Sequence, residues 1–389
     1  MAGAELPVGA PAETRPATKI LFIIYGLAPA GPELRLLEFS RHFPATSEVH
    51  ICVIGEDLTL LALLRETGAR VAIIPIRRPY TEWGQVWKVL SYIKEHDIAV
   101  INSFDLKTLL VGLAAKLRFR KRIQLVHHVV SLWEGLRDYH REFLWRALHF
   151  TDLVVCNGYA VKDHLIGSRT LRPRVVVVPN GVDCEYFRPS PDVRVAERTR
   201  QGFAPNHFVL GTVANVRSVK NYPLLLHTMQ RLAGNYPQVR LVCVGGGPQL
   251  AEMQGLAQQL GLRDRVVFTG QVTDVRSWVA TFDAFALCSF REGCPNALMQ
   301  AMAMEVASTS ANVGEVGYLT DGGRCGLLFD PTDGEAFFAA VSRLIDDKAY
   351  RAQLASAGRA QMEKHYSNAK MIGSYVTLFD AAIAELQRR

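Results

Sequence analysis

The sequence predicts an α/β protein of two doubly wound domains that face a central cleft. Short β-branched runs alternate with longer amphipathic stretches along nearly the whole chain. This pattern is typical of a parallel sheet covered by helices on both faces. The alternation stops once, in a stretch between residues 183 and 206 that holds several prolines, and then restarts. The length of 389 residues also fits two or three domains of about 150 residues each.

The first domain is predicted over residues 19–186. Its strands are expected at 19–25, 49–55, 71–76, 98–104, 123–129, 153–157 and 174–179. Amphipathic helices are expected between them, at 33–43, 58–66, 83–95, 106–117 and 137–150. Residues 1–18 are rich in Ala and Pro and lack the basic start and apolar stretch of a signal peptide. We therefore expect a disordered tail there.

The second domain is predicted over residues 187–366. Its strands are expected at 208–216, 239–247, 265–270, 284–290 and 326–330, and its helices at 222–232, 249–260, 335–346 and 349–365. A last helical pattern covers residues 371–386, and we expect the segment 367–389 to cross back to the first domain. Ligands of doubly wound sheets bind outside the carboxyl ends of the strands. The cleft is therefore the expected active site.

Composition excludes several classes of protein. Hydrophobic residues make up 49% and charged residues 21%, as in ordinary globular proteins. Seven cysteines lie scattered without a C-x-x-C pair, which argues against a zinc cage or a disulfide framework and favours a reducing, cytoplasmic location. The net charge of +7 fits an anionic substrate or an anionic membrane surface. No nucleic-acid recognition motif is visible, and we expect no nucleic-acid partner.

Four segments of the second half carry a resemblance to a known family. They read VVVVPNGVDCEYFRP, VANVRSVKNYPLLL, VCVGGGPQ and CSFREGCPNALMQAMAM. In this order and spacing they resemble the family 4 retaining glycosyltransferases, which have the GT-B fold, over residues 19 to about 346. The resemblance implies sugar transfer from a nucleotide-diphosphate sugar, as co-substrate, with neither a metal nor another cofactor. A glycan or lipid-linked acceptor in cell-envelope polysaccharide synthesis is a common role in this family.

The acidic motif of that family is only half present. The resemblance assigns Glu292 to the hydroxyls of the donor sugar, and Gln300 replaces the second glutamate, which binds the ribose. Exchanging a charged hydrogen bond for a neutral one costs about 1–2 kcal/mol, or roughly tenfold in donor affinity. Alternatively, Gln300 is an ordinary helix residue beside a decayed donor site. The same motif places Gly293, Pro295 and Asn296 beside the donor.

The cations expected at the diphosphate are also altered. Ala214 and Asn215 stand where the family has Gly-Arg, whereas Lys220 keeps the family's lysine. A cation there would stabilise the charge that develops on the leaving diphosphate. Arg217 is a candidate for the missing charge; alternatively it is a solvent-facing loop arginine, and Lys220 a solvated lysine at a helix start. A third departure has Met304, Glu305 and Ala307 at a helix end where glycine and proline are usual, and Glu305 there opposes the helix dipole.

Glycine-containing turns complete the predicted donor site. Gly245 and Gly246 end one strand, and Thr269 and Gly270 end the next, where the resemblance implies contact with the nucleotide. In the first domain, the loop at 28–33 keeps one family glycine, Gly31, and has Ala30 in place of its partner. Each of these could also be an ordinary tight turn.

Two histidines end the strand at 123–129. In the family a histidine at this place contacts the donor sugar, and strand alternation puts only one of His127 and His128 on the cleft side. We slightly prefer His127 as the catalytic one and leave His128 as an acceptor-side candidate. The segment that follows offers Trp133 and Arg137 as further acceptor-side candidates, while Trp145 is expected in the core.

A short basic cluster, AAKLRFRKR at 114–122, suggests peripheral contact with the inner face of an anionic membrane; alternatively it is a solvated helix end. Three other functions compete with the transferase. The changes at Ala30, Asn215 and Gln300 allow a non-catalytic relative that binds a sugar nucleotide or a partner enzyme. A non-hydrolysing sugar-nucleotide epimerase would share the two-domain plan. A nicotinamide oxidoreductase would need the G-x-G-x-x-G fingerprint, which is absent.

Overall fold

The computed structural model describes residues 18–28, 31–44, 47–130, 137–167 and 169–388. The predicted tail falls almost entirely outside these residues. The chain forms two compact units. The first comprises the described residues up to Asn157, then Val161–Val178 and the chain from Met371 onward; the second comprises Gly158–Ala160 and Pro179–Lys370. The sequence had placed the divisions after residues 186 and 366. Each unit is a parallel α/β sheet covered by helices, which confirms the predicted fold class.

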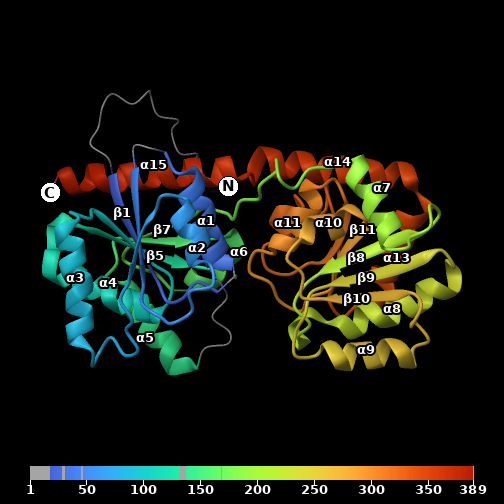
Figure 1. The fold of residues 1–389 in the computed structure, drawn as a ribbon, viewed down its shortest axis with the longest axis horizontal. Coiled ribbons are helices and arrows are strands. Elements are labelled where there is room, and N and C mark those ends of the chain that lie inside the picture. Colours follow the sequence, from blue (N-terminus) through green and yellow to red (C-terminus); the bar gives the residue numbers. More distant parts are fainter. Residues whose placement is uncertain (1–17, 29–30, 45–46, 131–136, 168, 389) are drawn as a thin grey trace. The chain divides into compact units, whose positions relative to one another are not determined.

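The sheet of the first unit has seven parallel strands in the order β3-β2-β1-β4-β5-β6-β7 (Figure 1). The strands are β1 (Thr18–Ile24), β2 (Ser47–Val53), β3 (Arg70–Ile73), β4 (Val100–Ser103), β5 (Gln124–Val129), β6 (Leu153–Cys156) and β7 (Arg174–Val177). The connecting helices are α1 (Gly31–His42), α2 (Leu61–Glu66), α3 (Trp83–Glu95), α4 (Leu106–Phe119), the short η1 (Arg120–Arg122), α5 (Asp138–Leu148) and α6 (Tyr159–Ile166).

Each face of this sheet has its own apolar core. On one face, β-strand side chains pack with α3, α4 and α5. On the other, they pack with α1 and with the last helix, α15 (Asn368–Gln387), from Met371 onward. The Tyr375 ring of α15 lies 4.6 Å from Phe39 of α1, edge to face. The C-terminal helix is therefore part of the first unit's core (Figure 1).

The sheet of the second unit has six parallel strands in the order β10-β9-β8-β11-β12-β13. They are β8 (Phe208–Val213), β9 (Val239–Val244), β10 (Val266–Gly270), β11 (Ala284–Leu287), β12 (Ala307–Ala311) and β13 (Leu327–Phe329). The helices are α7 (Pro191–Arg200), η3 (Ser218–Lys220), α8 (Tyr222–Asn235), α9 (Leu250–Gln259), α10 (Val275–Ala280), α11 (Asn296–Ala303), α12 (Val316–Leu319), α13 (Gly334–Asp346) and α14 (Lys348–His365). Figure 1 shows α8 and α9 on one face of the sheet and α10 and α11 on the other.

Several elements of the second unit were not predicted from the sequence: strand β12 and helices that include α7, α10 and α12. Strand β12 reads ASTSA and lacks the apolar run of a buried strand, yet it lies between β11 and β13 and is buried along its length. Helix α7 lies in the proline-containing stretch, where Pro191 occupies the first turn. Its Arg194 and Arg198 bind Asp283 at 2.6 and 2.9 Å, so polar contacts replace an apolar stripe.

Candidate functional site

The candidate donor site is built from loops at the carboxyl edge of the second unit's sheet. The loop after β8 leads into η3, which ends at Lys220. The loop after β11 leads to Glu292, and the backbone N–H of Phe290 in this loop donates to the Val219 carbonyl over 2.9 Å. This bond joins the two loops one residue before Lys220 and two residues before Glu292. The two residues predicted as most important therefore lie together.

Lys220 and Glu292 form an ion pair in which Lys220 Nζ lies 2.6 Å from Glu292 Oε1. Their side chains are 22% and 11% exposed, so the pair is open to a ligand only at its outer side. The hydroxyl of Ser289 donates to the same Glu292 Oε1 over 2.5 Å, and Ser289 is fully buried. Ser289 was not predicted from the sequence; its place three residues before the glutamate, on the same loop, was the available signal.

The backbone around Glu292 is held from the far side by the loop after β12. Gly314 has a φ of +54°, and a Cβ atom there would lie 1.9 Å from the Glu292 carbonyl oxygen, so only glycine fits. The next residue, Glu315, donates its backbone N–H to the Gly293 carbonyl over 2.9 Å. The Glu292 loop is therefore fixed on two sides.

The predicted glycine turn packs directly against the loop that precedes Lys220. The N–H of Val216 donates to the Gly246 carbonyl over 2.8 Å, and the N–H of Gly245 donates to the Gly270 carbonyl over 3.1 Å. A Cβ at Gly245 would lie 2.3 Å from the Ala214 carbonyl oxygen, so this close approach requires glycine. Thr269 is part of the same junction, since its hydroxyl lies 3.4 Å from the Gly245 nitrogen. The structure thus brings the predicted turns at 245–246 and 269–270 together with the loop that precedes Lys220.

Asn215 and Arg217 are both exposed on the loop before Lys220. The carbonyl of Arg217 accepts the N–H of Lys220 over 2.9 Å, which places Arg217 at the start of the same short turn. Both readings of Arg217, as a phosphate ligand or as a loop arginine, therefore remain predictions.

Helix α11 carries the other half of the acidic motif. Pro295 precedes its first residue, Asn296, whose side-chain oxygen accepts a hydrogen bond from Asn180 over 3.1 Å. Gln300 lies half-buried in the middle of this helix. Glu305, part of the third departure from the family pattern, lies just beyond the end of this helix and adopts a φ of +57°. This is the left-handed conformation that glycine would hold there.

The two histidines of β5 are both buried in the first unit. His127 Nδ1 lies 2.9 Å from the Ser103 hydroxyl, and burial lowers the pKa of His127 to about 3. His128 Nε2 lies 2.9 Å from Asn102 Oδ1, and its ring stacks on Phe104 and on Tyr375 of α15. Burial likewise lowers the pKa of His128 well below the ordinary value. Both imidazoles are therefore neutral near neutral pH.

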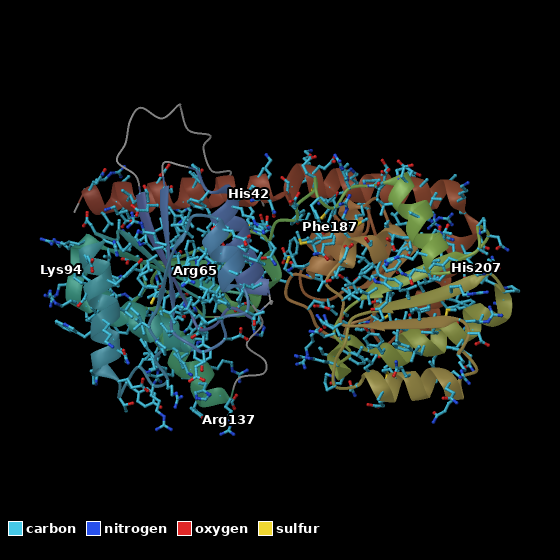
Figure 2. All side chains as sticks on the ribbon, viewed as in Figure 1. His42, Arg65, Lys94, Arg137, Phe187 and His207 are labelled. Carbon is cyan, nitrogen blue, oxygen red and sulfur yellow. The ribbon has the colours of Figure 1, made fainter. Side chains whose placement is uncertain are left out.

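The other first-unit residues singled out from the sequence are Gly31, Trp133, Arg137 and Trp145. Gly31 is the first residue of α1. Trp133 lies outside the described residues. Arg137 precedes α5 and is exposed, with its side chain directed away from the ribbon (Figure 2). Trp145 is buried in the core, as predicted.

Within the described residues, no group of three His, Cys, Asp or Glu side chains is placed to hold a metal ion. All seven cysteines are free thiols. No described helix is both long enough and apolar enough to cross a membrane.

Comparison with known proteins identifies the family of the chain. Residues 29–186 match the model of Glycosyltransferase Family 4, and residues 207–347 match that of Glycosyl transferases group 1. The putative glycosyltransferase EpsF of Bacillus subtilis is 27% identical over 302 residues, which cover 73% of this chain and 77% of that protein. A GDP-mannose-dependent alpha-(1-6)-phosphatidylinositol monomannoside mannosyltransferase of Mycolicibacterium smegmatis is 26% identical over 312 residues, covering 76% of this chain and 80% of that protein.

Solved structures show the same fold. Anabaena Alr3699/HepE in complex with UDP-glucose superposes with a TM-score of 0.82 at 24% identity, covering 93% of this chain and 99% of that one. The fold and the matched relatives define a glycosyltransferase with the GT-B fold. The chain belongs to glycosyltransferase family 4, within the glycosyl transferases group 1.

Proposed function

We propose that this glycosyltransferase moves a sugar from a nucleotide-diphosphate donor to a hydroxyl of a glycan or lipid-linked acceptor, with retention at the anomeric carbon. The observation that carries the proposal is the Lys220–Glu292 pair, 2.6 Å apart at the carboxyl edge of the second sheet. A cation next to a carboxylate suits a ligand that has a phosphate group adjoining a sugar. The glycine turn at 245–247 beside this pair suits close approach of a nucleotide.

In the proposed reaction, the bond between the anomeric carbon and the diphosphate oxygen breaks, and its electron pair leaves with the diphosphate. The acceptor oxygen bonds to the anomeric carbon, and the acceptor's proton leaves with the nucleoside diphosphate. Lys220 stabilises the charge that develops on the diphosphate, assisted by Arg217. Glu292 holds a hydroxyl of the donor sugar, and Gln300 holds the ribose. His127 of the first unit stays a sequence-based candidate for sugar contact; it is buried beside Ser103, and its lowered pKa leaves it uncharged.

The relatives suggest the first donors to test. The mannosyltransferase of M. smegmatis is named as GDP-mannose-dependent, and Alr3699/HepE was solved with UDP-glucose. Other relatives are named for lipopolysaccharide core biosynthesis in Rhizobium meliloti. These names support a nucleotide sugar as donor and an envelope glycan or lipid-linked glycan as acceptor. They favour the transferase over a non-catalytic sugar-nucleotide binder.

Turnover of UDP- and GDP-sugars, with and without glycan acceptors, tests the proposal. Glu292→Gln and Lys220→Ala should each lower transfer or donor hydrolysis about 100-fold or more, as loss of one preorganised charge does elsewhere. Glu335→Gln and Lys364→Ala, at exposed positions of the same unit, are the matched controls. Wild-type rates in both site variants would refute the assignment. NMR of the donor without acceptor would reveal an epimerase instead.

The same assay tests metal independence, which remains a prediction. The reaction should keep its rate in EDTA, because Lys220 and Arg217 are proposed to supply the positive charge at the diphosphate. Loss of activity in EDTA that Mg²⁺ or Mn²⁺ restores would contradict this assignment.

We further propose that the first unit rests on the inner face of an anionic membrane. At the end of α4, Leu117 is 76% exposed, and four exposed basic residues follow it: Arg118, Arg120, Lys121 and Arg122. Within this segment Lys116 is engaged with Asp152 at 2.7 Å, whereas the four others follow the exposed leucine in the chain. Basic residues near an anionic surface contribute about 1 kcal/mol each. Insertion of the Leu117 side chain into the membrane would add to this electrostatic attraction.

Sedimentation with vesicles tests the membrane proposal. The chain should bind vesicles that contain phosphatidylglycerol and release them at high salt, and replacing the four basic residues by alanine should weaken binding at least about tenfold. The matched control replaces four exposed basic residues of the second unit: Arg188, Arg263, Lys348 and Lys364. Equal binding of both variants would contradict the proposal.

A further inference from the structure

We infer that Ser289 is a positioning residue, which aims the carboxylate of Glu292 at the donor sugar. The inference rests on the proposed function of this site and adds a residue to it. Ser289 lies on the loop that follows β11, three residues before Glu292. Its hydroxyl donates to Glu292 Oε1 over 2.5 Å, a length typical of a hydroxyl bound to an ionised carboxylate.

Both donors at Glu292 bind the same carboxylate oxygen. Ser289 Oγ and Lys220 Nζ both reach Oε1, at 2.5 and 2.6 Å. Within the described part of the chain no residue donates to Oε2, so this oxygen is left for a ligand hydroxyl. A hydroxyl has one proton and Lys220 has three. The serine is therefore fully committed to Glu292, while the lysine keeps two protons for a phosphate.

Ser289 can hold this orientation because it is buried and its loop is anchored at the next residue. The residue is fully buried, and its neighbour Phe290 donates its N–H to Val219 over 2.9 Å. Lys220, by contrast, reaches Glu292 through a long side chain that is 22% exposed. A single donor to Oε1 fixes the distance between two groups better than it fixes the plane of a carboxylate. The buried hydroxyl supplies the second point that sets this plane and therefore the direction of Oε2.

Binding measurements separate this role from general stabilisation. Titration calorimetry with UDP, UDP-glucose, GDP and GDP-mannose identifies the nucleotide sugar that the wild-type chain binds. Ser289→Ala should then weaken that nucleotide sugar about tenfold, as loss of a hydrogen bond to a charged group does. It should leave the matching nucleoside diphosphate unaffected, because that ligand lacks the sugar. Ser308→Ala is the matched control, since this buried hydroxyl donates to the Val306 carbonyl instead.

A double-mutant cycle tests whether Ser289 acts through Glu292. In a Glu292→Ala background, Ser289→Ala should cost no further affinity for the nucleotide sugar, because the carboxylate it orients is gone. Equal losses in both backgrounds, or equal losses for the nucleoside diphosphate and the nucleotide sugar, would overturn the inference. If the wild-type chain and Ser289→Ala bound the donor equally well, the inference would be overturned and the proposed function would stand. A wild-type chain that binds none of the four ligands would overturn the proposed function with it.

Discussion

At the scale of single residues, the donor site combines retained and altered groups. Lys220 and Glu292 keep the family's residue types and meet at 2.6 Å. Asn215 and Gln300 replace a cation and a carboxylate, so the site has lost one positive and one negative charge relative to the family pattern. Because the two losses balance, the net charge of the site is preserved. The altered residues should therefore tune donor affinity more than they change the chemistry.

Gln300→Glu tests this view of the altered site. A carboxylate accepts hydrogen bonds from both ribose hydroxyls with charge assistance, so the variant should bind its donor about tenfold more tightly. Gln300→Ala should bind it more weakly than the wild type. Calorimetry with the donor checks both. A Gln300→Glu variant with unchanged affinity would show that residue 300 does not face the ribose.

At the scale of elements, helix α11 ends in a strained way. Glu305 has a φ of +57°, which costs about 1–2 kcal/mol for a residue with a side chain. Glu305 departs from the family pattern and opposes the helix dipole, and its conformation shows what the position requires. The position demands a left-handed residue, and the chain fills it with a glutamate. Nothing in the structure explains why a glutamate is kept there.

Glu305→Gly should therefore stabilise the second unit. The free energy gained by relieving the strain exceeds the free energy lost through the added entropy of the unfolded chain. We therefore expect the unfolding free energy to rise by about 0.5–1 kcal/mol. Denaturant unfolding measures it. Gln353→Gly, at an exposed position in the interior of helix α14, is the control and should lose about 1 kcal/mol. A loss of stability in Glu305→Gly would contradict the assigned strain.

The elements also show how far sequence patterns reach. Strands such as β1 and β9 were predicted from their continuous apolar runs, which are typical of strands buried on both faces of a parallel sheet. Strand β12 was not, because its small hydroxyl residues are buried by its neighbours and give no apolar signal. In the site, Lys220 and Glu292 were found from their motifs. Ser289 was not, because its role depends on a side-chain contact that only the folded loop creates.

At the scale of the whole molecule, the first unit contains buried neutral histidines. Burial lowers the pKa of His50 to about 4 and that of His127 to about 3, and it lowers the pKa of His128 well below the ordinary 6.5. All three lie on strands of the first sheet. The unfolded chain therefore takes up protons below pH 6.5 that the folded chain does not. Stability is complete above this pH and is lost as the pH falls toward the folded-state values.

This linkage predicts a steep pH dependence of unfolding. Between pH 6.5 and the folded-state pKa values, each of the three histidines should lower the unfolding free energy by about 1.4 kcal/mol per pH unit. Denaturant unfolding between pH 7.5 and 5 measures the slope. His50→Asn should reduce it by about a third. A first unit equally stable at pH 7.5 and 5 would contradict the burial of these groups.

The central claim is that a nucleotide sugar binds at Lys220 and Glu292. A crystal structure of the chain with UDP-glucose or GDP-mannose, whichever binds, tests it most directly. We predict a diphosphate oxygen about 3 Å from Lys220 Nζ and a sugar hydroxyl at a similar distance from Glu292 Oε2. A donor lodged elsewhere, or one bound in the second unit without touching either side chain, would contradict the account.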